Sequence, residues 1–341
     1  MLYVGLDVHL RTSSIHVLSD QGMKVKSYTV RGPWKPVVAS LGTLQEPFLV
    51  CFEASCGYGT LYDALSKVAN RVVVAHPGHL RLIFRSKRKN DRIDAERLAR
   101  LLYLDQVPEI HVPRIEVRDW RSLIELRQRE VNQQIRCKNR LRALLRHHGV
   151  ILPKGGKWIW TKAGRAWLSA LEWPTESSRM QCSIMLASLA GAEELVHQVT
   201  RHLDELGGQH SGVELLRTIP GVGPRTAEAV LAYLDDAHRF ERVNQVGSYF
   251  GLVPSQDASG GMNRLGHLTK NGPSTVRRLL IEAVWQSVRL DGGIRGYFER
   301  LHRGKKDRRK IALVATAHKL LRSMHAMLRT GETWSSNAWA T

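Results

Sequence analysis

Short apolar runs separated by turn residues dominate the first 110 positions of the chain. The runs that predict strands are 2–8, 13–19, 24–31, 48–53 and 71–75. Helices are expected after Pro36, over 59–68, and from about Asp91 to Leu104. Three strands in a meander followed by β/α alternation is the order of an RNase H-like domain, so this part is predicted to be α/β.

The stretch from Ile115 to His148 contains neither glycine nor proline, and its apolar residues recur near helical spacing. It predicts one helix on the order of 50 Å long. Arg127 and Lys138 interrupt the apolar seam. Two interpretations stay open, a long surface helix and a coil that dimerises or contacts RNA. Residues 150–212 are less informative, because their tryptophans are typical of a core.

The segment Leu215–Pro224 precedes an alanine-rich helix and carries the apolar–Pro–Gly–apolar–Gly pattern of a helix-hairpin-helix. Gly221 and Gly223 would let backbone N–H groups approach a phosphate at a helix N-terminus, and a tight interhelical turn is the simpler alternative. Further on, Ser259 is followed by two glycines, which predict a flexible loop where the backbone approaches a substrate closely. A basic helix follows it.

The net charge of +20 and a pI near 10.2 indicate a polyanionic partner, because neutralised phosphates release counterions. The candidate nucleic-acid-binding residues are Arg85, Lys87, Arg88, Lys89, Arg92, Gly221, Gly223, Lys270, Arg277, Arg278, Lys305 and Lys306. The four cysteines include no CxxC pair and are typical of buried thiols in a reducing compartment. With no signal-like start and no apolar run long enough to span a bilayer, we expect a cytoplasmic protein of a bacterial or archaeal cell that does not bind membranes.

Four acidic residues in the first third of the chain are the strongest candidates for chemistry. Asp7 and Glu53 each end an apolar strand, an unfavourable place for a carboxylate without a partner. Asp91 and Asp94 share one face of a predicted helix through their i, i+3 spacing. A shared divalent metal explains all four, because a hard cation takes oxygen ligands and cancels the repulsion among them. The adjacent basic run favours metal-assisted chemistry on phosphates.

These residues, in this order, resemble the DEDD-type (RuvC-like) insertion-sequence transposases, which are understood as bridge-RNA-guided DNA recombinases. The pieces that carry the resemblance are 89–95, 219–223, and 251–254 with 259–261 and 266–272 behind it. The resemblance spans nearly the whole chain. It implies a RuvC-like catalytic domain (1–110), a helical or coiled-coil oligomerisation region (111–211), a mostly helical transposase domain (212–330) and a tail (331–341). The transposase domain would hold the helix-hairpin-helix (about 215–234) and the serine loop (about 251–272).

The resemblance also implies a mechanism. The tetrad of Asp7, Glu53, Asp91 and Asp94 would bind Mg²⁺, with Mn²⁺ as a substitute. Ser259 would attack the DNA phosphate and form a covalent phosphoserine, with Ser255 as the fallback nucleophile. The implied partners are a non-coding bridge RNA, donor and target DNA, and further copies of this chain in a dimer and a dimer of dimers. Because serine and acids lie in different predicted domains, a composite site formed across subunits is a further hypothesis.

Three other functions compete with this one. A RuvC-like metal-dependent endonuclease or junction resolvase would use water and need no serine. Gly5–His9 with Thr12 and Ser13 faintly resembles a phosphate motif of actin-like kinases, but a second glycine-rich motif with an aspartate is missing and the charge fits a sugar kinase poorly. A nucleic-acid-binding scaffold with a degenerate site is disfavoured because all four acidic positions are filled. Tyr3, His9, Thr12 and Ser13 are additional candidates to line the metal site.

Overall fold

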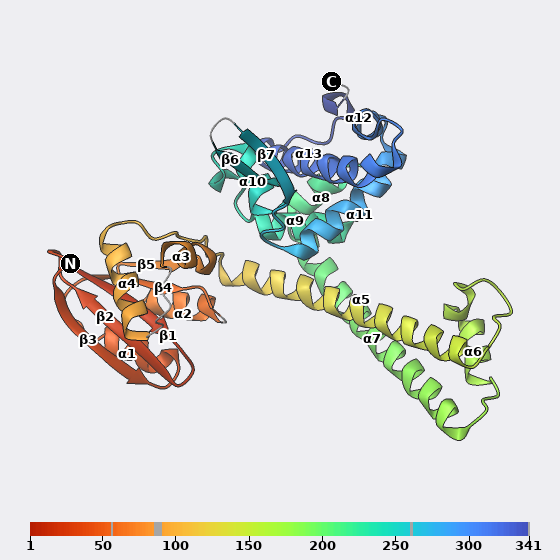
Figure 1. Cartoon of the computed structure of the whole chain (residues 1–341), viewed down its shortest axis with the longest axis horizontal. Coiled ribbons are helices and arrows are strands. Elements are labelled where there is room, and N and C mark those ends of the chain that lie inside the picture. Colours follow the sequence, from red (N-terminus) through yellow and green to blue (C-terminus); the bar gives the residue numbers. More distant parts are fainter. Residues whose placement is uncertain (56, 85–90, 260–261, 340–341) are drawn as a thin grey trace. The chain divides into compact units, whose positions relative to one another are not determined.

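The computed structural model describes residues 1–55, 57–84, 91–259 and 262–339 (Figure 1). Contacts divide the chain into two compact units, Met1–Arg118 and Asp119–Thr341. Each unit has its own hydrophobic core. The domain boundaries expected at 110, 211 and 330 stay predictions.

The first unit is built on a five-stranded mixed sheet in the order β3-β2-β1-β4-β5. The strands are β1 (Leu2–Val8), β2 (Thr12–Leu18), β3 (Lys24–Arg31), β4 (Phe48–Glu53) and β5 (Arg71–Ala75). The pairs β1–β2 and β2–β3 are antiparallel, whereas β1–β4 and β4–β5 are parallel. All five predicted strands are confirmed to within one residue at each end, and the mixed sheet is consistent with an RNase H-like domain.

Alternation along the strands divides the side chains between two layers. The even residues of β1 and β4 pack with α1 (Trp34–Leu41) and α2 (Tyr58–Leu65) on one face of the sheet. The odd residues of β4, with Val73 and Ala75 of β5, pack with α4 (Asp91–Tyr103) on the other face, near the short helix α3 (Pro77–Ile83). Residues of a strand that differ by two therefore share a layer, and this alternation places the odd-numbered acids of β1 and β4 on the α4 side.

Gly5 determines how closely α4 approaches the sheet. A Cβ atom on Gly5 would lie 2.0 Å from the Ala95 carbonyl oxygen and 2.4 Å from the Ala99 backbone nitrogen. Both distances are far below van der Waals contact, so only a hydrogen fits between β1 and α4. The close approach brings the first turn of α4 to the end of β1.

The first unit ends in a segment that covers the edge of the sheet and continues into a long helix. Ile110 donates its N–H to the Val74 carbonyl at 2.8 Å, so this segment runs beside β5. In the first turn of α5 (Ile115–His147), Arg118 pairs with Asp63 of α2 and donates to the Pro113 carbonyl at 2.7 Å. Arg118 therefore anchors the start of α5 to the first unit.

Two antiparallel helices of 33 residues each, α5 and α7 (Glu176–Gly208), open the second unit. Arg127 donates to Thr200 Oγ1 at 2.8 Å, and Lys138 Nζ lies 3.6 Å from Glu193 Oε1. The two basic residues that interrupt the apolar seam of α5 thus have polar partners on α7. Between the helices, η1 (Trp158–Trp160) and α6 (Lys162–Ser169) pack with the tryptophans of this region into a small core.

The rest of the second unit is a helical assembly with one hairpin. Its helices are α8 (Ser211–Arg217), α9 (Pro224–Leu234), α10 (Val243–Tyr249), α11 (Ser274–Leu290), α12 (Gly292–His302) and α13 (Arg309–Thr330), with short 3-10 turns η2 (Ala237–Arg239), η3 (Lys306–Arg308) and η4 (Ser336–Trp339). The described part of the expected tail belongs to the core, because Trp339 is 1% exposed and Trp334 Nε1 donates to Asp291 Oδ2 at 3.0 Å. None of the helices in the described ranges has an apolar stretch that would cross a membrane.

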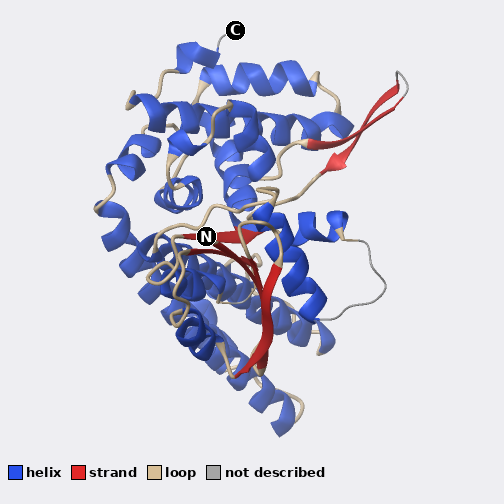
Figure 2. Ribbon diagram, turned by 90° about the vertical axis from the view of Figure 1, so that its left-hand side faces the viewer, coloured by secondary structure: helices blue, strands red, loops and turns tan. Residues whose placement is uncertain are grey.

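The expected serine loop contains two strands, β6 (Pro254–Ser259) and β7 (Met262–Leu268), paired antiparallel. Figure 2 shows this hairpin extending away from the helices of its unit. The flexible loop was expected at Ser259 and the two glycines that follow it; Ser259 ends β6, and Gly260 and Gly261 lie outside the described residues, so the loop stays a prediction. The two strands around it were not predicted. Polar residues occupy both faces of the strands, so the sequence lacks the apolar alternation that reveals a half-buried strand.

Candidate metal centre

The parallel pairing of β1 and β4 brings two acids to one edge of the sheet. The last paired residues are Leu6 and Phe52, so Asp7 and Glu53 come next on their strands. Both acids are odd-numbered and so lie on the α4 side of the sheet, and the first turn of α4 carries Asp91 and Asp94. The four acids predicted from the sequence thus come from three elements that meet at the carboxyl end of β1 and β4.

A pocket of about 370 Å³ lies at this edge, and three of the four acids line it: Asp7, Glu53 and Asp94. His9, Ser55, Arg81, Phe84 and Arg97 are among its other lining residues. The pocket therefore combines carboxylates with two guanidinium groups. Such a mixture suits a phosphate held beside a metal ion.

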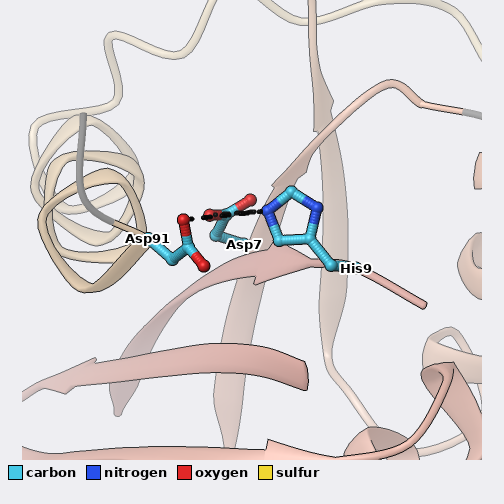
Figure 3. Close-up of side chains that lie close together, drawn as sticks. All are labelled: Asp7, His9 and Asp91. Atoms are coloured by element: carbon cyan, nitrogen blue, oxygen red, sulfur yellow. Dashed lines mark hydrogen bonds and ion pairs between the residues drawn. The ribbon is translucent and has the colours of Figure 1, made fainter. Parts of the chain in front are cut away.

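Asp91 joins the site through a tighter group with Asp7 and His9. One ligand atom from each of these three residues lies within 4.8 Å of the other two. Figure 3 shows the three side chains converging, with His9 Nε2 3.2 Å from Asp7 Oδ2 and 4.0 Å from Asp91 Oδ1. Within the described ranges this is the one such group of acidic, histidine and cysteine side chains. Glu53 and Asp94 line the pocket without belonging to it.

Asp94 has a second polar contact inside the pocket. Arg97 Nη1, one helical turn further along α4, donates to Asp94 Oδ1 at 3.3 Å, and its guanidinium lies 5.0 Å from the centre of the Phe84 ring. The sequence analysis did not single out Arg97. Its i, i+3 spacing from Asp94 was the available signal, because residues three apart on a helix face each other.

Asp7 is a partly buried carboxyl group with two other acids, Asp91 and Asp94, nearby. Burial raises the pKa of the Asp7 carboxyl above its ordinary value; His9 opposes this shift, whereas Asp91 and Asp94 add to it. The Asp7 side chain is 18% exposed. A carboxylate that is both desolvated and close to like charges is stabilised by a cation among them. Carboxylate oxygens are the ligands that Mg²⁺ and Mn²⁺ prefer, so the residues present fit a divalent metal.

The segment predicted to be a helix-hairpin-helix contains α8, a turn, and α9, which begins at Pro224. Its two glycines differ in surroundings. Gly221 has φ +91°, and a Cβ there would lie 2.5 Å from the Ser287 backbone nitrogen of α11. Gly223 is exposed at the N-cap of α9 with open space around it. Gly221 thus serves the packing of the turn, and Gly223 leaves the start of α9 open to a ligand.

Two of the predicted basic contacts are engaged within the protein. Arg277 donates to the carbonyl oxygens of Phe250 and Gly272 at 3.1 Å each and also to that of Asn271, so it fixes the chain on both sides of the hairpin. Arg278 pairs with Gln128 and donates to Asn132 Oδ1 at 3.0 Å. Their contribution to nucleic-acid binding stays a prediction.

The other basic residues predicted to bind nucleic acid are exposed or lie outside the residues that the structure describes, and the two candidate serines belong to the hairpin. Arg92, Lys270, Lys305 and Lys306 are exposed. Arg85, Lys87, Arg88 and Lys89 lie outside the described residues. Ser259 is the last residue of β6 and pairs with Met262. The Ser255 hydroxyl lies against Gly266 of β7, 2.4 Å from where a Cβ would stand.

Two families of known proteins match separate parts of the chain. Residues 4–149 match a DEDD family of the IS110 type described as "Transposase", and residues 213–299 match the "Transposase IS116/IS110/IS902 family".

Three relatives illustrate the similarity. The transposase for insertion sequence element IS1111A of Coxiella burnetii is 25% identical over 82% of this chain and 75% of its own length. The transposase for insertion sequence element IS1328 of Yersinia enterocolitica is 25% identical over 85% of this chain and 86% of its own. A probable family 20 transposase of Pseudomonas aeruginosa is 27% identical over 83% and 84%. With both family regions present in order, this chain belongs to the IS110/IS116/IS902 family of transposases.

Proposed function

We propose that this transposase cuts and rejoins donor and target DNA at a divalent-metal site held by Asp7, Glu53, Asp91 and Asp94. The observation that carries the proposal is the convergence of these acids from β1, β4 and α4 at one pocket edge. Mg²⁺ is the expected ion, with Mn²⁺ as a substitute. When bound, it would stabilise the negative charge that develops on the phosphate during strand exchange.

The protein's own groups would position the DNA around the acids. Arg81 and Arg97 line the same pocket and carry the positive charge that a backbone phosphate requires. Arg97 is already held against Asp94, so its guanidinium has a defined place in the site. These residues would hold the scissile phosphate, and the net charge of +20 would attract the rest of the duplex.

Ser259 is the proposed nucleophile. Its hydroxyl oxygen would form a bond to phosphorus while one P–O bond of the DNA backbone breaks. The serine hydroxyl would lose its proton, and the sugar oxygen that leaves would take up a proton and become a hydroxyl. One phosphate ester replaces another, so the bond is kept for rejoining. Ser259 ends β6, a strand of the hairpin that is exposed along residues 254–258.

The target sequence is proposed to come from a structured RNA. Contacts to phosphates carry no sequence information, and the predicted contacts here are mostly basic side chains and glycines. The test is to purify the protein from cells that carry its flanking non-coding DNA and to sequence the RNA that copurifies. A discrete RNA supports guidance, and folded protein with only random RNA argues against it.

The covalent step has a direct test. Wild-type protein is incubated with Mg²⁺ and DNA, trapped with denaturant, digested and examined by mass spectrometry for a nucleotide on a peptide containing Ser259. Ser259→Ala is expected to abolish the adduct and strand cleavage together, whereas Ser255→Ala, four residues away on the same strand, should keep both. An adduct on Ser255 would assign the role of nucleophile to Ser255. Cleavage by Ser259→Ala at the wild-type rate would refute the proposal that Ser259 is the nucleophile.

One observation favours a second function, a metal-dependent endonuclease that uses water. The residues that line the acid pocket all belong to the first unit, which therefore holds the acids and guanidinium groups that such an endonuclease would use. This function predicts that Ser259→Ala still cuts DNA and that Asp7→Asn does not. The pair of variants therefore separates the two functions, since both lose cleavage under the phosphoserine mechanism.

A further inference from the structure

His9 lies beside two of the four acids of the proposed metal site, Asp7 and Asp91. It follows β1 directly and has the same odd parity as Gly5 and Asp7, the residues of β1 on the α4 side. Its Nε2 atom lies near both carboxylates of the group, 3.2 Å from Asp7 Oδ2 and 4.0 Å from Asp91 Oδ1 (Figure 3). Nothing in the tetrad of acids accounts for an imidazole there.

These separations match those between ligands of one cation. Two atoms bonded at about 2.1 Å to the same ion lie about 3.0 Å apart when adjacent and about 4.2 Å apart when opposite. The 3.2 Å and 4.0 Å distances each lie within about 0.2 Å of one of these two values. The third pair of the group, the oxygens of Asp7 and Asp91, lies within 4.8 Å, so small rotations of exposed side chains complete the arrangement.

We propose that His9 is a nitrogen ligand, through Nε2, of the divalent cation bound by Asp7 and Asp91. The inference rests on the proposed metal site and adds to it a ligand outside the acidic tetrad. Bonding through Nε2 requires the neutral imidazole with its proton on Nδ1. A carboxylate set with one imidazole binds Mn²⁺ more favourably relative to Mg²⁺ than carboxylates alone, because nitrogen ligands suit transition metals. His9 would therefore raise the affinity of the site for Mn²⁺ relative to its affinity for Mg²⁺.

The competing role for His9 is that of a counter-ion, in which protonated imidazole pairs with Asp7. This role and metal ligation exclude each other at one nitrogen atom. A cation entering the site would displace a protonated His9 and leave no nitrogen bonded to the metal. A spectroscopic measurement on the bound metal therefore distinguishes the two without any need for activity.

The experiment is pulsed electron paramagnetic resonance on the full-length protein loaded with one equivalent of Mn²⁺. Bound imidazole nitrogen gives a ¹⁴N modulation of the electron spin echo, expected in the wild type and in His79→Ala, an exposed histidine outside the group. The modulation should disappear in His9→Ala. Asp7→Asn, which removes a carboxylate of the same group, should lose the stoichiometric Mn²⁺ itself.

Titration calorimetry supplies the second readout. His9→Ala is expected to weaken Mn²⁺ binding on the order of tenfold or more and Mg²⁺ binding by less. His9→Gln, which offers an amide oxygen instead of the nitrogen, should narrow the ratio of Mn²⁺ to Mg²⁺ affinity while keeping both ions bound.

Two results would overturn the inference, and they are distinguishable. If wild-type Mn²⁺ binding depends on Asp7 but shows no ¹⁴N modulation, or if the modulation persists in His9→Ala, His9 is not a ligand and the metal site itself stands. If the wild type binds no stoichiometric, Asp7-dependent Mn²⁺, the proposed metal site falls together with the role of His9.

Discussion

Replacing Gly5 with alanine tests whether the close approach of α4 to β1 assembles the acidic site. The new Cβ would be 2.0 Å from the Ala95 carbonyl oxygen and 2.4 Å from the Ala99 nitrogen, both backbone atoms inside a helix. Neither atom belongs to a side chain that rotates away, so α4 must retreat by roughly 1.4 Å before the 2.0 Å separation reaches the 3.4 Å of ordinary van der Waals contact. Overpacking of this kind costs typically about 1–3 kcal/mol of the free energy of unfolding.

The retreat also carries Asp91 and Asp94 away from Asp7. A displacement of about 1 Å at a reacting centre lowers rates on the order of 100-fold, so strand cleavage by Gly5→Ala should fall by a similar factor. Mn²⁺ affinity, measured by calorimetry, should weaken with it. Hydrogen exchange should speed up in α4 before it changes elsewhere, since the lost packing is local.

Gly191→Ala is the matched control, because it adds the same atom where nothing lies within 4 Å. Gly191 is exposed inside α7, so alanine there should raise the free energy of unfolding by about 0.5–1 kcal/mol through helix propensity and leave cleavage unchanged. If Gly5→Ala keeps wild-type thermal unfolding and wild-type Mn²⁺ affinity, the contact between β1 and α4 does not govern the site.

Further substitutions test three separate parts of the structure. Asp7→Asn removes a desolvated charge next to Asp91 and Asp94, so the metal-free protein should gain about 1 kcal/mol in the free energy of unfolding. Mg²⁺ should no longer raise the melting temperature of this variant. A metal-free melting temperature below the wild-type value would contradict the repulsion among these carboxylates. Gly221→Ala should lower the free energy of unfolding, measured with denaturant, by more than about 1 kcal/mol, because φ is +91° and Ser287 blocks the Cβ. Gly223→Ala should leave the free energy of unfolding unchanged. Equal unfolding curves for the two variants would argue against the different roles of these glycines. Glu228 is 1% exposed and pairs with Arg225, and burial raises its pKa to about 7. The folded state therefore binds the Glu228 proton more tightly than the unfolded state does. The free energy of unfolding should consequently fall as pH rises from about 4.5 to 7. Glu228→Gln should flatten that part of the pH profile, and an unchanged slope would show that another group is responsible.

The sequence was most informative where an apolar run marked both an element and the acid at its end. Such runs located β1 and β4, and the charged residue at the end of each marked Asp7 and Glu53. The i, i+3 spacing of Asp91 and Asp94 located the third element. What remained hidden was the register of β1 against β4, because many residues separate these strands along the chain.

Other elements escaped prediction for identifiable reasons. The helix α7 contains Gly191, Gly207 and Gly208, which lower helix propensity and concealed a span as long as α5. The hairpin of β6 and β7 carries too few apolar residues for alternation to appear. Arg277 was interpreted as a nucleic-acid contact because its charge is visible in the sequence, whereas the three carbonyl groups that it binds are fixed only by the fold.

The anchoring of Arg118 has a practical consequence for dissecting this protein. An expressed fragment cut at residue 110 would lose Val112 from the hydrophobic cluster and leave Asp63 without its guanidinium partner. It would also expose an unfinished chain end beside β5. Ending the fragment at 118 or beyond retains both contacts, so protease-resistant material from limited digestion should terminate after Arg118 and not before it.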